Sequence, residues 1–168
     1  MLHFLLYSLL FTSSEAINCW SCASNNMKQN FLTKQRGPAG RIQQPKVFSD
    51  DCNGSTNFIR DRSADDCGSD GICIKWTQTL NNSGAYSVMT FRGCYHKMFN
   101  LQDPAIFKPP NYAYCTYSQV PLQCLSDASV LEDTCWCQQD FCNFSTGKLN
   151  FFYFIILYAF FLLYSVKL

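Results

Sequence analysis

Ionisable side chains are scarce in this sequence, and the familiar catalytic motifs are absent from it. Its 168 residues include two histidines, and charged side chains make up 15% of the chain. We find no GxSxG, HExxH or GxGxxG pattern and no phosphate-binding glycine loop. His96, the one histidine beyond the first few residues, has the neighbours of a surface residue. We therefore expect no enzymatic activity, no catalytic residue, no cofactor and no small-molecule substrate.

An excess of basic charge is also lacking. The formal net charge is +1. Removal of the two terminal segments discussed below, which carry Glu15, Lys148 and Lys167, leaves acids and bases in balance. Domains that bind nucleic acid usually present a basic face, so nucleic acid is not an expected partner.

Long apolar runs are confined to the two ends of the chain. The first is followed by Ser14-Glu15-Ala16, which fits the small-x-small pattern of a signal-peptidase site. The run is too short to span a membrane. We interpret residues 1–16 as a signal peptide for the secretory pathway, with a buried N-terminal helix as the alternative.

The C-terminal run, Phe151 to Val166, would form a helix about 24 Å long, against about 30 Å of bilayer hydrocarbon. Small residues begin at Ser145, and the polar spacer Lys148 to Asn150 is shorter than the usual roughly 8–12 residues. We predict glycosylphosphatidylinositol (GPI) attachment at Ser145, removal of 146–168, and an extracellular domain over 17–145. The protein would then lie on the outer face of the plasma membrane. A single-pass anchor is the alternative.

Cysteine, by contrast, is abundant. All eleven cysteines lie between the two terminal segments, and a secretory route favours their pairing as disulfides. Cys19-Trp20-Ser21-Cys22 would also suit a redox pair or half a zinc site. No βαβ pattern surrounds it, and a second histidine is missing from the mature chain, so we expect no metal. The closing block CWCQQDFCN, Cys135 to Asn143, is then a disulfide staple.

The cysteine pattern resembles that of the lymphocyte-antigen-6 and urokinase-receptor family. The resemblance rests on NCWSC (Asn18 to Cys22) and on CWCQQDFCN, while CIKWTQT and FRGC are similar to the invertebrate neuronal branch with quiver/sleepless and odour-response members. Trp136 separates two cysteines that are adjacent in the usual family pattern. The resemblance implies a small, disulfide-rich, all-β domain with the three-finger fold of snake neurotoxins.

The resemblance also implies the disulfide pairs. They are Cys19–Cys73, Cys22–Cys52, Cys67–Cys94, Cys115–Cys135 and Cys137–Cys142. Cys124 is left unpaired, and a Cys124–Cys135 pair with Cys115 free stays open. Asn143 is implied to tie the C-terminal end to the first strands, although Asn143-Phe144-Ser145 is also a glycosylation sequon.

Alternation predicts a β-hairpin in the second finger. Ile74, Trp76 and Leu80 share one face of a strand, Asn81 to Gly84 form the turn, and Tyr86 to Phe91 return. Asn81 and Asn53 begin sequons and are predicted surface glycans.

The first finger, Ala23 to Asp51, carries a basic run that includes Lys34, Arg36 and Arg41. This run is either a solvated loop or a fingertip that meets an acidic receptor surface or lipid headgroups. Trp76 is a further candidate contact. Aromatic side chains in the third region, at Phe99, Phe107, Tyr112 and Tyr114, serve either packing between fingers or binding.

The resemblance implies a GPI-anchored protein that binds and modulates a receptor or ion channel in the same membrane, with a role in neuronal excitability, sleep or behaviour. Two alternatives share the fold: a cell-surface adhesion or ligand-binding protein, and an epithelial protein that organises junctions. In each case we expect the fingers, and not a pocket, to carry binding.

Overall fold

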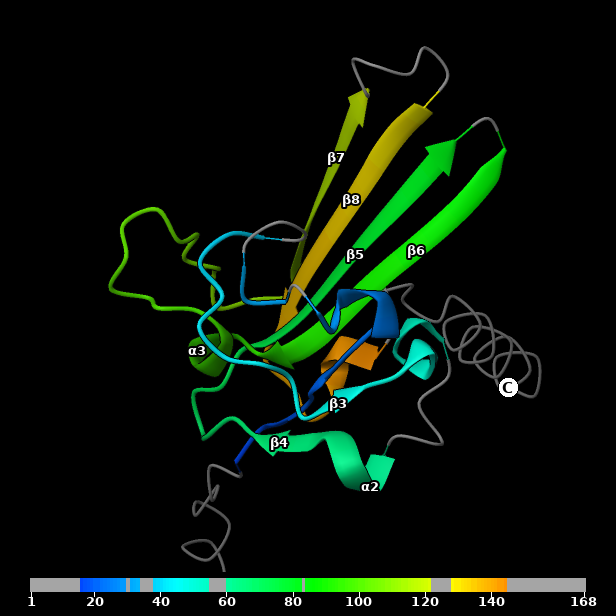
Figure 1. The fold of residues 1–168 in the computed structure, drawn as a ribbon. Helices are drawn as coiled ribbons and strands as arrows, with labels where there is room; N and C mark the ends of the chain where they lie inside the picture. The colour runs from blue at the N-terminus through cyan, green and yellow to red at the C-terminus, as the bar shows by residue number, and fades with distance from the viewer. Residues whose placement is uncertain are drawn as a thin grey trace, which may run out of the picture.

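The fold is taken from a computed structural model of the chain, which describes residues 16–29, 31–33, 38–54, 60–82, 84–121 and 128–144 (Figure 1). Several predictions made from the sequence lie outside these residues. They are the signal peptide up to residue 15, Lys34, Arg36, Cys124, and the proposed anchor segment from Ser145 to the end of the chain.

Strands dominate the described residues. A two-stranded sheet pairs β1 (Asn18–Trp20) with β4 (Ala64–Asp66). A six-stranded sheet has the order β3-β2-β6-β5-β8-β7. Its strands are β2 (Cys22–Ala23), β3 (Val47–Phe48), β5 (Cys73–Asn82), β6 (Ala85–Cys94), β7 (Tyr114–Pro121) and β8 (Ala128–Cys137). The helices α2 (Arg60–Ser63) and α3 (Tyr95–Met98) have one turn each, and three short 3-10 turns are η1 (Asn25–Met27), η2 (Asp50–Asn53) and η4 (Cys142–Phe144). Of the predicted all-β three-finger domain, the structure confirms the coarser part, a small, disulfide-rich and mostly β fold.

Two long hairpins project from the base of the molecule (Figure 1). The predicted hairpin is confirmed: β5 and β6 pair antiparallel without interruption from Cys73↔Cys94 to Asn82↔Ala85. Its turn uses Gly84, whose φ of 92° suits a residue without a side chain. The second hairpin joins β7 to β8, and β8 also pairs with β5 along its whole length. The two hairpins therefore form one continuous four-stranded surface.

The hydrophobic core lies on one face of this sheet, near its base. Trp76 and Phe91 are directly paired across β5 and β6, and their rings stack at 5.7 Å. The buried core cluster comprises Ala23, Met27, Phe31, Ile74, Trp76, Met89, Phe91, Tyr95, Met98, Phe99, Ile106 and Trp136.

The first finger contributes side chains to the core. In the described part of 23–51, Met27 and Phe31 are buried against the sheet, and the strand structure is limited to the short parallel pair β2–β3. Arg41 forms an isolated bridge with Phe99. Because its apolar side chains are needed to cover the core, this segment folds back over the sheet.

Five disulfides fix the base of the domain, and they join the same cysteine pairs that the resemblance implies. They are Cys19–Cys73, Cys22–Cys52, Cys67–Cys94, Cys115–Cys135 and Cys137–Cys142. Cys19, Cys73 and Cys94 form one buried cluster with Cys67, Cys137 and Cys142 packed around it. Closing a loop of about 15 residues contributes roughly 3 kcal/mol in the chain-entropy account, so several bridges can stabilise a fold with a modest core.

Asn143 joins the end of the domain to its first strand. Its side chain is 2% exposed, and Nδ2 donates to the carbonyls of Trp20 and Ile74 at 2.9 and 3.0 Å. Its Oδ1 accepts from the Trp20 amide at 3.0 Å. This geometry fits the tying role that the resemblance implies.

Arg92 reinforces the same junction from β6. Its Nε donates to the Cys52 carbonyl at 3.1 Å, and Nη1 donates to the carbonyls of Asn143 and Phe144. Desolvation by burial lowers the pKa of Arg92 to about 10. A buried guanidinium is tolerated here because three carbonyl oxygens receive its hydrogens.

Candidate binding surface on the finger strands

Two of the side chains predicted to contact a partner are buried. Trp76 is 0% exposed and belongs to the core. Arg41 is 5% exposed, its Nε donates to the Phe31 carbonyl at 2.9 Å, and its guanidinium lies 4.6 Å from the centre of the Phe31 ring. The prediction that these two residues meet a partner is therefore wrong, because both are used in packing the sheet face. Lys34 and Arg36 lie outside the described residues.

The charges of the first finger are also partly used within the molecule. Lys46 lies 3.3 Å from Asp65, which belongs to the acidic segment that follows. Lys97 approaches the same carboxylate at 3.0 Å. The charge of Lys46 is thus at least partly balanced within the molecule, by Asp65.

The uncovered face of the hairpins carries a different set of side chains. Cross-strand pairing puts Val88 and Leu131 opposite the same residue of β5, Thr79, so these two side chains share a face. Tyr86 lies two residues along β6 from Val88, and Tyr117 pairs with Asp133, two residues along β8 from Leu131. Their exposed fractions are 68% for Tyr86, 75% for Tyr117, 37% for Val88 and 44% for Leu131.

We call this set of four side chains, Tyr86, Val88, Tyr117 and Leu131, the finger face. Sequence reasoning missed it, although part of the signal was available. The alternation that buries Met89 and Phe91 sends Tyr86 and Val88 to the opposite side of β6. The contribution of β7 and β8 could not be predicted, because it depends on how these strands pair with β5.

Charges adjoin the finger face towards its base. Lys75 and Asp133 lie on this side of the sheet, on neighbouring strands. Desolvation lowers the pKa of Lys75, with a further lowering by the nearby Arg92, whereas Asp133 raises it. Desolvation raises the pKa of Asp133, and Lys75 opposes that change. Towards the base, the finger face is thus bordered by a half-buried pair of opposite charges, Lys75 and Asp133.

The three sequons differ in their access. Asn53 is exposed, and its Oδ1 accepts from the Ser24 hydroxyl at 2.6 Å. Asn81 is half-buried, accepts from the Gly84 amide at 3.1 Å, and pairs directly with Tyr86. A glycan on Asn81 would therefore border the finger face at its tip. The Nδ2 of Asn143, by contrast, is buried and makes two hydrogen bonds.

The aromatic side chains of the third region, which were predicted to serve either packing or binding, differ in their exposure. Phe99 is buried in the core, whereas Phe107, Tyr112 and Tyr114 are each more than a third exposed. Phe107 and Tyr114 both pack on Trp136, with ring centres 4.8 and 5.9 Å apart. These side chains extend the core outward along the face that the first finger covers.

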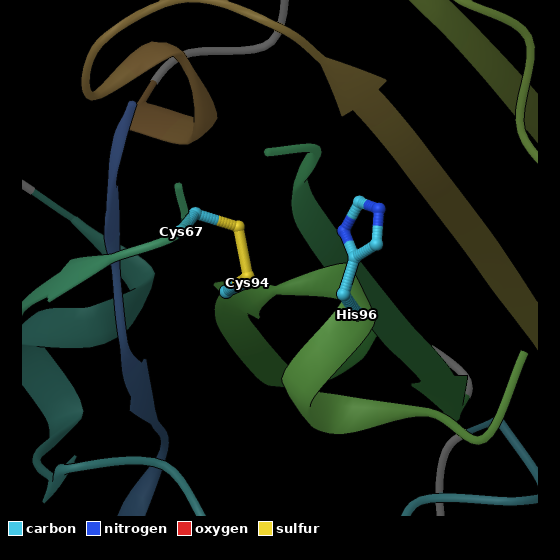
Figure 2. Close-up of side chains that lie close together, drawn as sticks. All are labelled: Cys67, Cys94 and His96. Carbon is cyan, nitrogen blue, oxygen red and sulfur yellow. A yellow bond between two sulfur atoms is a disulfide. The ribbon is translucent and has the colours of Figure 1, made fainter. Parts of the chain in front are cut away.

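Within the described ranges, two groups of side chains have the composition of a metal site. In the first, Cys67, Cys94 and His96 place their ligand atoms within 4.8 Å of one another. Figure 2 shows the two sulfur atoms joined as a disulfide, with the imidazole beside them. The second, Cys115 with Asp133 and Cys135, also contains a disulfide. Because metal ions bind thiolates, neither group offers the cysteine ligands of a metal centre in this oxidised state.

Comparisons with protein-family models, with curated proteins and with solved structures found no match for this chain. Within the part of the chain that the structure describes, no helix has both the length and the apolar character needed to cross a membrane. The fold and its five bridges define the chain as a small, disulfide-rich, mostly β protein, and the exposed finger face is its candidate site.

Proposed function

We propose that this chain is a three-finger protein of the lymphocyte-antigen-6 and urokinase-receptor type, anchored by GPI at Ser145, that binds and modulates a receptor or ion channel in its own membrane. The observation that carries this proposal is the finger face, where two tyrosines and two aliphatic side chains stand exposed on a rigid sheet. Exposed tyrosines on a pre-organised surface are effective anchors in protein interfaces.

The position of the chain end supports a partner in the same membrane. The Phe144 carbonyl accepts from Arg92, which lies on the same side of β6 as Tyr86 and Val88. The described chain therefore ends at the base of the hairpins on the side of the finger face (Figure 1). A lipid anchor just beyond Phe144 would hold this face close to neighbouring membrane proteins.

Tethering also lowers the affinity that binding requires. Two proteins held in one membrane meet at a high effective concentration, so a small interface suffices. The half-buried charges below the finger face would add little attraction at long range, because Lys75 and Asp133 oppose each other. The tyrosines would mainly set the lifetime of the complex.

The contact is tested by Tyr117→Ser and Tyr86→Ser, with Tyr112→Ser as the matched control. Tyr112 is 62% exposed but lies in the loop before β7, outside the finger face. At equal surface display, we expect the first two variants to reduce at least tenfold the receptor or channel subunit that co-purifies from cross-linked cells. An equal effect of the control, or none in any variant, would refute the contact.

The anchor is tested separately on intact cells. Phosphatidylinositol-specific phospholipase C should release the protein into the medium, because the proposed tail at Ser145 is replaced by lipid. Retention of the protein in the membrane after this treatment would favour the single-pass alternative.

A further inference from the structure

A cavity of about 350 Å³ opens on the side of the sheet opposite the finger face. The segment at 38–40, the loop after α3, and the β5 and β8 strands form its walls. Its volume lies at the lower end of the range for small-molecule sites. The finger-face proposal makes no use of this cavity.

Four aromatic side chains line the cavity: Tyr95, Phe99, Phe107 and Trp136. Their rings contact one another, with centres 4.8 Å apart for both Tyr95–Phe99 and Phe107–Trp136. The Tyr95–Trp136 pair is edge-on at 6.2 Å. Aromatic faces carry partial negative charge and attract cations within about 6 Å of the ring centre.

Two carboxylates complete the lining, and no basic residue is among the described residues that form it. Asp103 lies in the loop after α3, and Glu132 lies on β8. The Asp103 carboxylate is held in place, because Oδ1 accepts from the Ala105 amide at 2.9 Å. The Glu132 carboxylate makes no hydrogen bond or ion pair with another described residue. Among the described residues, the cavity therefore combines aromatic walls with two carboxylates that have no basic partner.

Hydrogen bonds within the protein hold the loop that forms the cavity wall. The Tyr95 hydroxyl donates to the Phe107 carbonyl at 2.5 Å, which fixes the far end of the loop to α3. Within the loop, Ile106 donates to the Asp103 carbonyl at 3.0 Å, and Asp103 donates to the Asn100 carbonyl at 3.1 Å. A pre-formed wall reduces the entropy that binding would cost.

We infer that this cavity binds a small organic ammonium ion, with the aromatic rings around its alkyl groups and with Asp103 and Glu132 facing its charge. A neutral apolar ligand would leave both carboxylates to lose water without compensation, and an anion would be repelled by them. A bare metal ion would find two carboxylates but mainly apolar walls, whereas an alkylammonium ion matches both components of the lining.

The inference is tested with choline and its uncharged isostere 3,3-dimethyl-1-butanol, by saturation-transfer-difference NMR on the mature protein purified from expressing cells. Choline should bind with a Kd of about 1 mM or tighter, and the isostere at least tenfold more weakly. Equal binding of the two compounds, or no saturation of the choline methyl groups at about 10 mM, would overturn the inference.

Variants locate the site. Glu132→Gln and Asp103→Asn should each weaken choline binding about threefold to tenfold, because each removes a charge without a change of shape. Phe107→Leu removes an aromatic wall at a position that is 47% exposed and should also weaken binding. Asp70→Asn, on an exposed loop away from the lining, is the control and should have no effect. Losses of equal size in all four variants would contradict the assignment.

Discussion

Asn143 is the residue on which the closure of the domain most depends, because one amide group serves three backbone partners. Asn143→Asp retains the shape but replaces the Nδ2 donor with an oxygen that faces two carbonyls. Each unsatisfied buried partner costs about 1–3 kcal/mol, so we expect a loss of at least about 2 kcal/mol and poor secretion. Thermal unfolding and secreted yield measure this loss. The exposed Asn111→Asp is the control, and equal behaviour of the two variants would contradict the role.

Tyr95 gives the fold a dependence on alkaline pH. Desolvation by burial raises its pKa from 10.0 to about 12. Because the folded state favours the neutral phenol, its stabilising contribution is complete below pH 10 and is lost as the pH rises towards 12. Denaturant unfolding of the wild type and Tyr95→Phe should show their stability difference shrinking across this interval. A constant difference would mean that the fold does not raise the pKa of Tyr95.

At the scale of single residues, the role expected for Asn143 came from the family resemblance and not from the chemistry of its side chain. Asn143 follows the last cysteine of a recognisable block, and its contacts fit the role that the resemblance implies. Arg41 and Trp76 were assigned to a surface although they lie in the interior. The sequence of a basic run, or of a tryptophan near a hairpin base, does not reveal whether the side chain faces solvent or the core. Burial depends on whether another segment of the chain covers it.

At the scale of secondary-structure elements, the β5–β6 hairpin was predictable from the sequence and the path of the first finger was not. The β5–β6 hairpin was predictable because alternation, β-branched side chains and a turn glycine are all local signals. The path of the first finger was not, because the few apolar residues of this mainly polar segment, Met27 and Phe31 among them, do not specify which surface they cover. Their burial depends on the aromatic surface that β5 and β6 present.

Arg41 tests this path of the first finger. Arg41→Glu would place a carboxylate at the Phe31 carbonyl and over aromatic rings, so it should lower surface display by itself. Lys108→Glu, on an exposed loop position, is the matched charge reversal and should display normally. Normal display of both variants would indicate that the first finger is a solvated loop.

At the scale of the whole molecule, the disulfides supply part of the stability that a larger hydrophobic core would otherwise provide. The resemblance, and not the spacing of the cysteines, implied the connectivity that the structure contains.

Cys142→Ser removes the Cys137–Cys142 disulfide, which joins two cysteines five positions apart at the end of the described chain. Loss of a native bridge in a small secreted domain costs about 2–5 kcal/mol, so secretion should fall. Quantitative immunoblotting of cell surface and medium measures it, and wild-type levels would contradict the account.

Photo-cross-linking on living cells tests the central claim most directly. A photoreactive phenylalanine derivative at position 117, on the finger face, is compared with the same residue at position 112. The account predicts a covalent adduct with a receptor or channel subunit of the same cell from position 117, and none from position 112. Adducts from both positions, none from either, or adducts only with proteins of adjoining cells would contradict a partner held in the same membrane.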